Sequence, residues 1–118
     1  MTFQQAIQSG FQNFTNFKDR SCRSEYWYWV LFAVIAGVVG GILDRIIGTN
    51  FLQFLVAIAL FVPGLAVAAR RMHDIGKSAR ILLLGLIPFV GLYLIYLAVQ
   101  PSEPGPNAYG AGPLPPPA

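Results

Sequence analysis

The residues of this chain that could do chemistry gather in two polar segments, one from Lys18 to Glu25 and the other from Arg70 to Arg80. The candidate cluster comprises their ionisable and hydroxyl-bearing residues: Arg20, Arg23, Glu25, Arg70, Arg71, His73, Asp74, Lys77 and Ser78. Carboxylates beside arginines form ion pairs, and clustered guanidinium and ammonium groups bind phosphate or carboxylate anions. The residue types therefore indicate either a structural salt-bridge cluster or an anion-binding site.

The structural interpretation rests on spacing. Arg70 and Asp74 are four residues apart, so they can pair on one face of a helix that continues through this segment. Glu25 lies where an apolar stretch begins and could pair with Arg70 or Arg71. On this interpretation the polar side chains join the ends of two helices.

The stretch Gly76-Lys77-Ser78 has two interpretations of its own. Gly76 could end one helix in a left-handed turn, and Ser78 could cap the next helix. The stretch also resembles the end of a phosphate-binding P-loop. That motif requires a glycine where Arg71 stands and a strand before it, where this chain has an apolar stretch of helical length. We therefore predict a loop between helices and no nucleotide site.

Catalysis or metal binding would have to use Cys22, Glu25, His73 and Asp74, which are all capable ligands. The chain has one histidine, however, and no pair of ligands at a metal-binding spacing. Adjacent residues on a helix point in different directions, which separates the His73 and Asp74 side chains. We predict no catalytic residue, metal or cofactor.

Three long apolar stretches must position these residues, at about residues 26–43, 51–69 and 81–99. Each is long enough, at about 1.5 Å per residue, for a helix that crosses a hydrocarbon core of about 30 Å. Charged residues make up only 11% of the chain, against about 25% in soluble domains. The sequence therefore predicts an all-α integral membrane protein with three transmembrane helices.

Small residues recur at four-residue spacing within the first two stretches, where they allow close helix packing. They are Ala33, Gly37 and Gly41 in the first stretch and Gly64 and Ala68 in the second. We favour packing within one chain over homodimerisation.

The two ends of the chain differ from its middle. Residues 2–17 place Phe3, Ile7, Phe11 and Phe14 on one helical stripe, which predicts an amphipathic helix in the membrane interface or against the bundle. Seven of the nine prolines follow residue 100. We predict a single membrane domain over residues 1–110 and a disordered, proline-rich end over residues 111–118.

The basic residues predict the orientation. Seven of the eight flank the first stretch on its N-terminal side or lie between the second and third stretches, and only Arg45 lies elsewhere. The positive-inside rule then assigns both segments and the N-terminus to the cytoplasm, with the C-terminus outside. This pattern accounts for the net charge of +3 without nucleic acid. Each cation near an anionic leaflet contributes about 1 kcal/mol, so this face could bind phospholipid.

The same segments resemble a known family. They read Arg20-Ser21-Cys22-Arg23-Ser24-Glu25-Tyr26-Trp27, Arg70-Arg71-Met72-His73-Asp74-Ile75-Gly76-Lys77-Ser78 and Gly105-Pro106-Asn107-Ala108-Tyr109-Gly110. Together they resemble the YhaH-like family of small bacterial inner-membrane proteins, of the DUF805 type, roughly from Phe11 to Gly110. Departures are Asp19 and Ala79-Arg80. The resemblance implies an inner-membrane location and supplies no activity or catalytic residue.

We therefore predict a multi-pass inner-membrane module, non-enzymatic, that binds a protein partner or anionic lipid through its basic cytoplasmic face. A homo-oligomer or a membrane-protein partner remains open. The alternative is a small-solute transporter or lipid-modifying enzyme that uses Arg70, Arg71, His73 and Asp74. Transport is disfavoured because the apolar stretches hold no charge for a midplane site.

Overall fold

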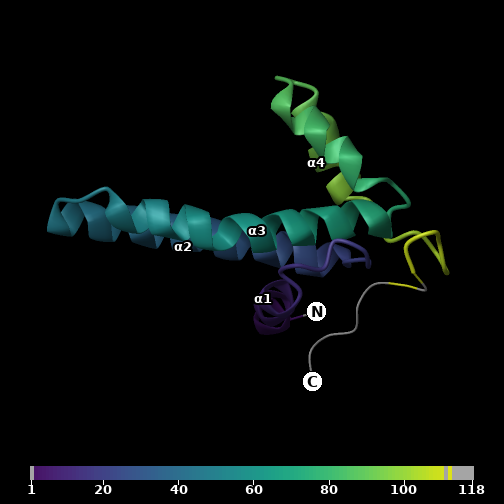
Figure 1. Ribbon diagram of the computed structural model, residues 1–118, viewed down its shortest axis with the longest axis horizontal. Coiled ribbons are helices and arrows are strands. Elements are labelled where there is room, and N and C mark those ends of the chain that lie inside the picture. The colour runs from purple at the N-terminus through teal and green to yellow at the C-terminus, as the bar shows by residue number, and fades with distance from the viewer. Residues whose placement is uncertain (1, 111, 113–118) are drawn as a thin grey trace.

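The computed structural model describes residues 2–110 and residue 112. The regular secondary structure of these residues consists of helices, with no strand. The helices are α1 (Phe3–Gln12), α2 (Arg23–Ile47), α3 (Phe51–Asp74), the 3-10 helix η1 (Ala79–Leu86) and α4 (Gly91–Ala98) (Figure 1). Residues 107 and 110 form an isolated β-bridge. The predicted disordered end over residues 111–118 lies outside the described residues, apart from residue 112.

Helices α2 and α3 form a long antiparallel pair. They contain 25 and 24 residues, with mean hydropathies of 2.2 and 2.4 in their most apolar windows, so both are long and apolar enough to cross a membrane. The turn between them is fixed by Gly48, whose φ of 75° ends α2 in a left-handed conformation. Asp44 then accepts hydrogen bonds from the backbone N–H groups of Leu52 and Gln53, both at 2.9 Å, which caps α3.

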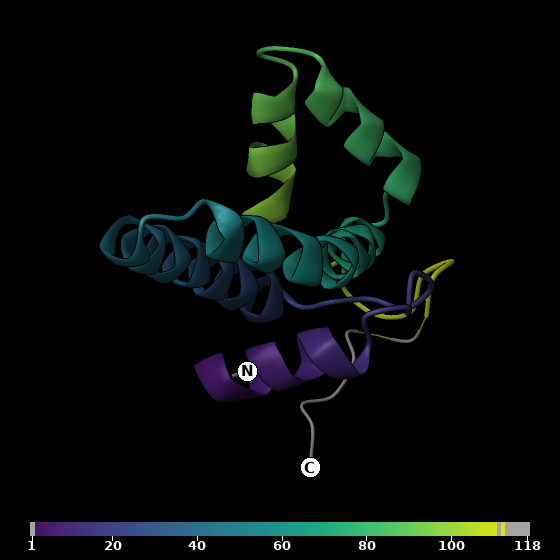
Figure 2. The ribbon, with the colours of Figure 1, turned by 60° about the vertical axis from the view of Figure 1, so that its left-hand side comes forward.

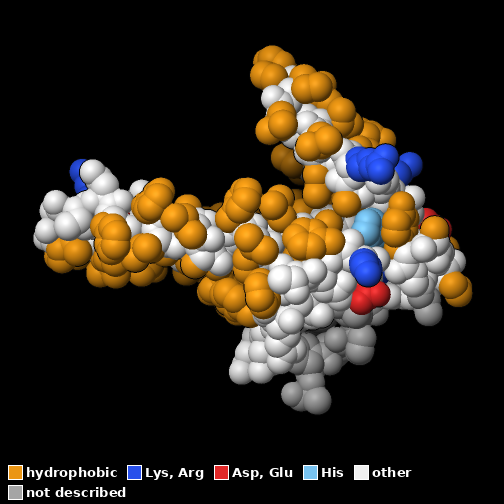
Figure 3. All heavy atoms as spheres, in the orientation of Figure 1, with side chains coloured by type: hydrophobic (Ala, Val, Ile, Leu, Met, Phe, Trp, Pro, Cys, Tyr) orange, Lys and Arg blue, Asp and Glu red, His pale blue; other side chains and the backbone are white. Residues whose placement is uncertain are grey.

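The outer surface of this pair is apolar along most of its length (Figure 3). Large side chains of both helices are more than two-fifths exposed, among them Val34, Val38, Ile42, Phe54, Ile58 and Phe61. Water would not stabilise such a surface, whereas hydrocarbon would. The solvent around the middle of the pair is therefore lipid.

The predicted small-residue faces meet the neighbouring helix only in part. A Cβ added to Gly41 would lie 3.3 Å from Gln53 Nε2, and one added to Gly64 would lie 3.5 Å from Trp29 Nε1. One added to Gly37 would meet nothing within 4 Å. Ala33 and Ala68 are half-buried.

The prediction of a third continuous helix over residues 81–99 is wrong. This segment forms η1 and α4, two arms of eight residues each that project from the α2–α3 pair as a hairpin (Figure 2). Pro88 explains the break, because proline lacks a backbone N–H and disfavours helical geometry at the residue before it. Ile87 is accordingly extended, with ψ of 123°, and Phe89 takes a positive φ of 68°. We define residues 79–98 as the apolar hairpin.

The apolar hairpin is short and its arms lie close together. A Cβ added to Gly91 would lie 3.6 Å from the Cα of Gly85, so the backbones almost touch. Eight residues reach about 12 Å as α-helix and about 16 Å as 3-10 helix, which is roughly half of the hydrocarbon thickness. Neither arm can cross a membrane.

The hairpin turns the chain back to the end from which it left. The Glu103 N–H donates to the Asp74 carbonyl at 2.8 Å, and Arg20 donates to the carbonyls of Gly105 and Gly110. Residues 103–110 therefore lie beside the segment that precedes α2. The predicted outside location of the C-terminus required a third span, which residues 79–98 do not form.

Helix α1 lies across the α2–α3 pair, seen end-on in Figure 1 and from the side in Figure 2. A capping box between Thr2 and Gln5 begins it. It packs on α2 through Gly10, where an added Cβ would overlap the Trp29 ring at 2.3 Å. The helix ends at Gln12 and so is shorter than predicted, and it packs against the helix pair, which is one of the two positions predicted for it.

Candidate functional site

The predicted polar cluster is assembled at the end of the α2–α3 pair where the hairpin and the tail also meet. Three arginines and two carboxylates in it have a relative exposure of 0%: Arg20, Arg70, Arg71, Glu25 and Asp74. We call these five residues the arginine clamp. Buried ions are stable only when they are paired and hydrogen-bonded, so the partners of each decide what the clamp can do.

Glu25 organises one half of the clamp. Arg70 Nη2 donates to its Oε1 at 2.6 Å, and the hydroxyls of Ser21 and Ser9 donate at 2.9 and 3.0 Å. Arg70 also donates from Nε to the Ser21 hydroxyl and from Nη1 to the Asn13 carbonyl at 2.8 Å. This half therefore joins α1, the segment after it, α2 and α3.

Asp74 organises the other half. Its Oδ1 accepts from Arg20 Nε at 3.0 Å, and its Oδ2 accepts from Arg71 Nη1 at 2.7 Å and from the Ser102 hydroxyl. Arg20 Nη2 donates to the Glu103 carbonyl at 2.7 Å, while Arg71 Nε donates to the Ala98 carbonyl at 3.1 Å. This half ties α3 to the N-terminal segment and to the chain after α4.

The pairs differ in part from those expected. Glu25 pairs with Arg70, one of the two alternatives. Asp74 pairs with Arg71, three residues away, and with Arg20, rather than with Arg70. Arg70 is instead engaged by Glu25, by the Ser21 hydroxyl and by the Asn13 carbonyl, which leaves Asp74 to the other two arginines.

His73 joins the tail to the N-terminal segment. Its Nδ1 lies 3.2 Å from the Lys18 carbonyl and 3.1 Å from the Asp19 carbonyl, so this nitrogen carries the proton and donates. The imidazole stacks on Tyr109 with a centroid distance of 4.0 Å and an interplanar angle of 2°. The Asn107 amide donates to the His73 carbonyl at 2.9 Å.

The remaining predicted residues lie on the surface around the clamp. Arg23, Lys77 and Ser78 are exposed, as are Lys18 and Arg80. The Ser78 hydroxyl accepts from the Arg80 N–H at 3.3 Å and so caps η1. We call Lys18, Arg23, Lys77 and Arg80 the basic rim. The three ion pairs found among the described residues all belong to the clamp, and none uses the rim.

Sequence reasoning did not identify Ser9, Ser21, Ser102, Asn107 and Tyr109 as parts of this site. Asn107 and Tyr109 stand in the Gly105–Gly110 stretch that carried the family resemblance, which was a usable signal. Ser21 had the same signal, because it stands in the Arg20–Trp27 stretch that also carried the resemblance. Ser9 and Ser102 had none, because an isolated serine has many possible roles.

The buried polar atoms of the clamp all have hydrogen-bond partners within the protein. Within the described part of the chain, no buried side-chain nitrogen or oxygen lacks a hydrogen-bond partner, and no group of three His, Cys, Asp or Glu residues could hold a metal ion. Three guanidinium groups against two carboxylates leave one net positive charge. The clamp therefore joins the N-terminal segment, α2, α3 and the tail, and it carries a net positive charge.

Comparison with known proteins finds a matching family and two groups of curated relatives. Residues 14–111 match the model of a family described as a protein of unknown function (DUF805). Inner membrane protein YhaH of Escherichia coli K12 is 38% identical over 109 residues, covering 86% of this chain and 90% of the relative. Inner membrane protein YhaI of the same strain is 35% identical over 105 residues, covering 86% and 89%. No solved structure matches the chain significantly.

Proposed function

The chain belongs to the DUF805 family of proteins of unknown function, and from that premise we propose that it is a non-enzymatic inner-membrane module that holds anionic phospholipid at the cytoplasmic face. The relatives are named as inner membrane proteins. The proposal has two parts, which are the position of the chain in the membrane and the surface that meets the lipid.

In the proposed position α2 and α3 cross the bilayer, while α1 and the apolar hairpin lie in the cytoplasmic leaflet. Arg45 lies at one end of the pair, and the clamp and rim hold the seven other basic residues at the opposite end. The positive-inside rule supports a cytoplasmic location for that end. Because residues 103–110 contact Arg20, the N-terminal segment and the tail share the cytoplasmic side.

The basic rim carries the function. Its four cations are exposed where the apolar helices end, at the depth of phosphate groups, and the exposed acids of that end are Asp19 and Glu103. The rim therefore outweighs the acids, and the net positive charge of the clamp adds to the same field. Each exposed cation contributes about 1 kcal/mol of attraction to an anionic leaflet.

The alternative of a transporter or lipid-modifying enzyme has less support. It requires Arg70, Arg71, His73 and Asp74 to reach a substrate. All four are buried, and each is hydrogen-bonded within the protein. A substrate would have to displace these bonds and leave a buried ion unpaired. Breaking a buried ion pair in this way costs about 3–5 kcal/mol.

Native mass spectrometry of the purified protein tests the proposal. We expect the protein to retain phosphatidylglycerol in preference to phosphatidylethanolamine. The combined variant Lys18→Ala/Lys77→Ala/Arg80→Ala should lose part of that preference, because Arg23 remains, and Arg45→Ala at the other end should keep all of it. Charge reversal at Arg70 or Arg71 is unsuitable because it would break the clamp. Equal retention of both lipids, or a co-purifying polypeptide in place of lipid, would contradict the proposal.

A further inference from the structure

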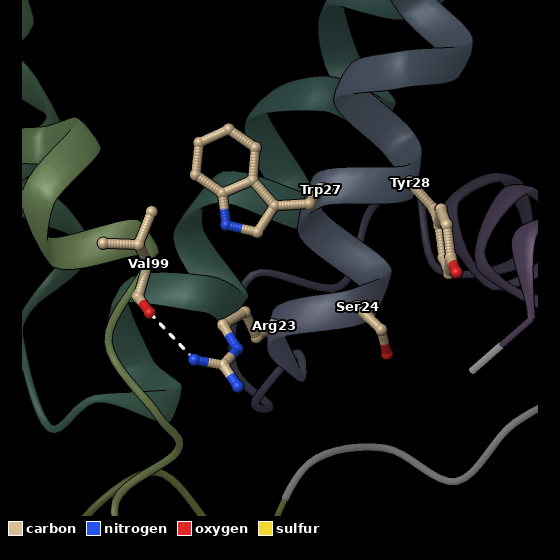
Figure 4. A pocket seen from close by; sticks show the side chains of 5 residues that line it. All are labelled: Arg23, Ser24, Trp27, Tyr28 and Val99. Atoms are coloured by element: carbon tan, nitrogen blue, oxygen red, sulfur yellow. Dashed lines mark hydrogen bonds between the residues drawn. The ribbon is translucent and has the colours of Figure 1, made fainter.

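A pocket of about 510 Å³ lies between the first two turns of α2 and the residue after α4. It is lined by Arg23, Ser24, Trp27, Tyr28 and Val99 (Figure 4). We propose that this pocket seats the phosphate-bearing headgroup of one anionic phospholipid, with Arg23 as the residue that binds the phosphate. The inference rests on the proposed function and names the site at which it acts.

The α2 residues that line the pocket change from polar to aromatic along the helix, in the same order as the headgroup and the glycerol region of a lipid. Arg23 and Ser24 lie in the first turn of α2. Trp27 and Tyr28 lie one turn later, on the same helix faces as Arg23 and Ser24 respectively, because residues four apart share a face. A polar level is thus followed by an aromatic level. Indole and phenol rings favour the zone between headgroups and acyl chains, so the order matches a phosphate above a glycerol backbone.

The opposite wall is held in place by two hydrogen bonds. Arg23 Nη1 donates to the Val99 carbonyl at 3.1 Å, and Trp27 Nε1 donates to the Ala98 carbonyl at 3.0 Å. These bonds fix the guanidinium and the indole before any ligand arrives. The guanidinium has five N–H donors, and the bond to Val99 is the one hydrogen bond assigned to Arg23 in the described part of the chain.

The electrostatic environment favours an anion. No acidic residue lines the pocket. Glu25, the nearest acid in sequence, faces away into the clamp, where Arg70 and two serine hydroxyls engage it. The pocket also adjoins the start of α2, a 25-residue helix whose N-cap residue Cys22 makes no side-chain capping bond, so the positive end of the helix dipole adds to the field of Arg23.

A phospholipid fits the pocket better than a soluble phosphate does. Beyond Arg23 and Ser24 the lining is aromatic or aliphatic, and the pocket lies between two helices whose outer surfaces are apolar. A soluble phosphate would not cover the apolar surfaces of Trp27, Tyr28 and Val99 that line the pocket, whereas the glycerol and first methylene groups of a lipid would cover them. Arginine is also suited to a phosphate because it can bind two of its oxygens at once.

Quenching of Trp27 fluorescence by brominated phospholipid tests the site. In a Trp29→Phe background Trp27 is the remaining tryptophan. We expect brominated phosphatidylglycerol to quench it at lower concentration than brominated phosphatidylcholine does, and excess inorganic phosphate should not reverse the quenching. Arg23→Gln should weaken the phosphatidylglycerol effect about tenfold, as expected for a lost charge-assisted hydrogen bond. Arg23→Lys should recover part of it.

Two further variants keep the test decisive. Arg45→Gln removes a cation at the opposite end of α2, outside both the pocket and the basic rim, and it should leave Trp27 quenching unchanged. Val99→Phe partly fills the pocket, adds no tryptophan and retains Arg23, and it should reduce quenching by the anionic lipid even if Arg23→Gln does not fold. Unchanged preference in both Arg23→Gln and Val99→Phe would overturn the pocket while leaving lipid retention at the rest of the rim intact. No preference in the parent protein, by quenching and by mass spectrometry, would instead remove the proposed function.

Discussion

Arg70 and Glu25 join α3 to α2 through a contact of 2.6 Å between Nη2 and Oε1, and both side chains are completely buried. Such a pair contributes little net stability by itself, because desolvation of two ions offsets most of their attraction. Substitution of only one of the two residues is costly, however, since the remaining ion stays buried without its partner. The pair is therefore a fixed point of contact between the two helices.

Glu25→Gln should destabilise the protein by about 3 kcal/mol or more, because it leaves Arg70 charged and buried without a counter-ion. Thermal unfolding in detergent and the amount of protein in the membrane would measure the effect. Arg45→Gln is the matched control, since Arg45 is exposed at the other end of α2 and takes part in none of the ion pairs described. Equal melting temperatures for the two variants would show that the clamp is not structural.

Asp74→Asn should be more damaging than Ser102→Ala. The first change leaves Arg20 and Arg71 without the carboxylate that both contact, whereas the second removes a single hydrogen bond worth about 1 kcal/mol. Membrane abundance of the two variants gives the comparison, with His73→Ala as an intermediate case. If Asp74→Asn and His73→Ala reached normal abundance and yet abolished a cellular phenotype, the enzyme or transporter interpretation would gain support.

Gly10→Ala should loosen α1 from α2, because its Cβ would overlap the Trp29 ring at 2.3 Å. Overpacking of this kind costs about 1–3 kcal/mol. Gly37→Ala is the natural control, since a Cβ there meets nothing within 4 Å and alanine is favoured over glycine within a helix by about 0.5–1 kcal/mol. The two alanine variants should thus shift the melting temperature in opposite directions, and a shared direction would argue against the packing of α1.

Tyr109→Ala should release the tail from the clamp, because it removes the ring that stacks on His73 at 4.0 Å. The loss should be about 0.5–1.5 kcal/mol, as for other aromatic pairs, and Tyr109→Phe should keep most of it. Limited proteolysis between residues 99 and 110 would report the release directly. Cleavage of Tyr109→Phe at the same rate as Tyr109→Ala would mean that the stack does not hold the tail.

Much of the fold could be predicted because hydrophobicity alone determines it. Charge-free stretches of membrane length located α2 and α3, although both helices extend beyond the predicted bounds of 26–43 and 51–69. Their polar ends could be helical because the clamp satisfies them, as Glu25 and Asp74 illustrate. Hydropathy did not distinguish a span from the apolar hairpin, since the residues around Pro88 are apolar in either case.

The site was predicted as a set of residues but not as a geometry. Six of the nine predicted cluster residues are buried together, and Arg23, Lys77 and Ser78 lie outside on the surface. The geometry could not be predicted because arginine side chains donate to backbone carbonyls as well as to carboxylates. Arg20 and Arg71 bond to carbonyls of Glu103 and Ala98, and no side-chain pattern encodes such contacts. For the same reason the sequence did not predict that residues 103–110 contact the N-terminal segment.

The sidedness of the tail tests the account most directly. In a Cys22→Ser background, single cysteines at Lys18, Asn50 and Pro104 can be treated with a membrane-impermeant maleimide in cells whose outer membrane has been opened. All three positions are exposed in the structure. We expect labelling of Asn50→Cys alone, with Lys18→Cys and Pro104→Cys protected until the inner membrane is disrupted. Labelling of Pro104→Cys with protection of Lys18→Cys would separate the two segments that the clamp joins, and it would contradict the account.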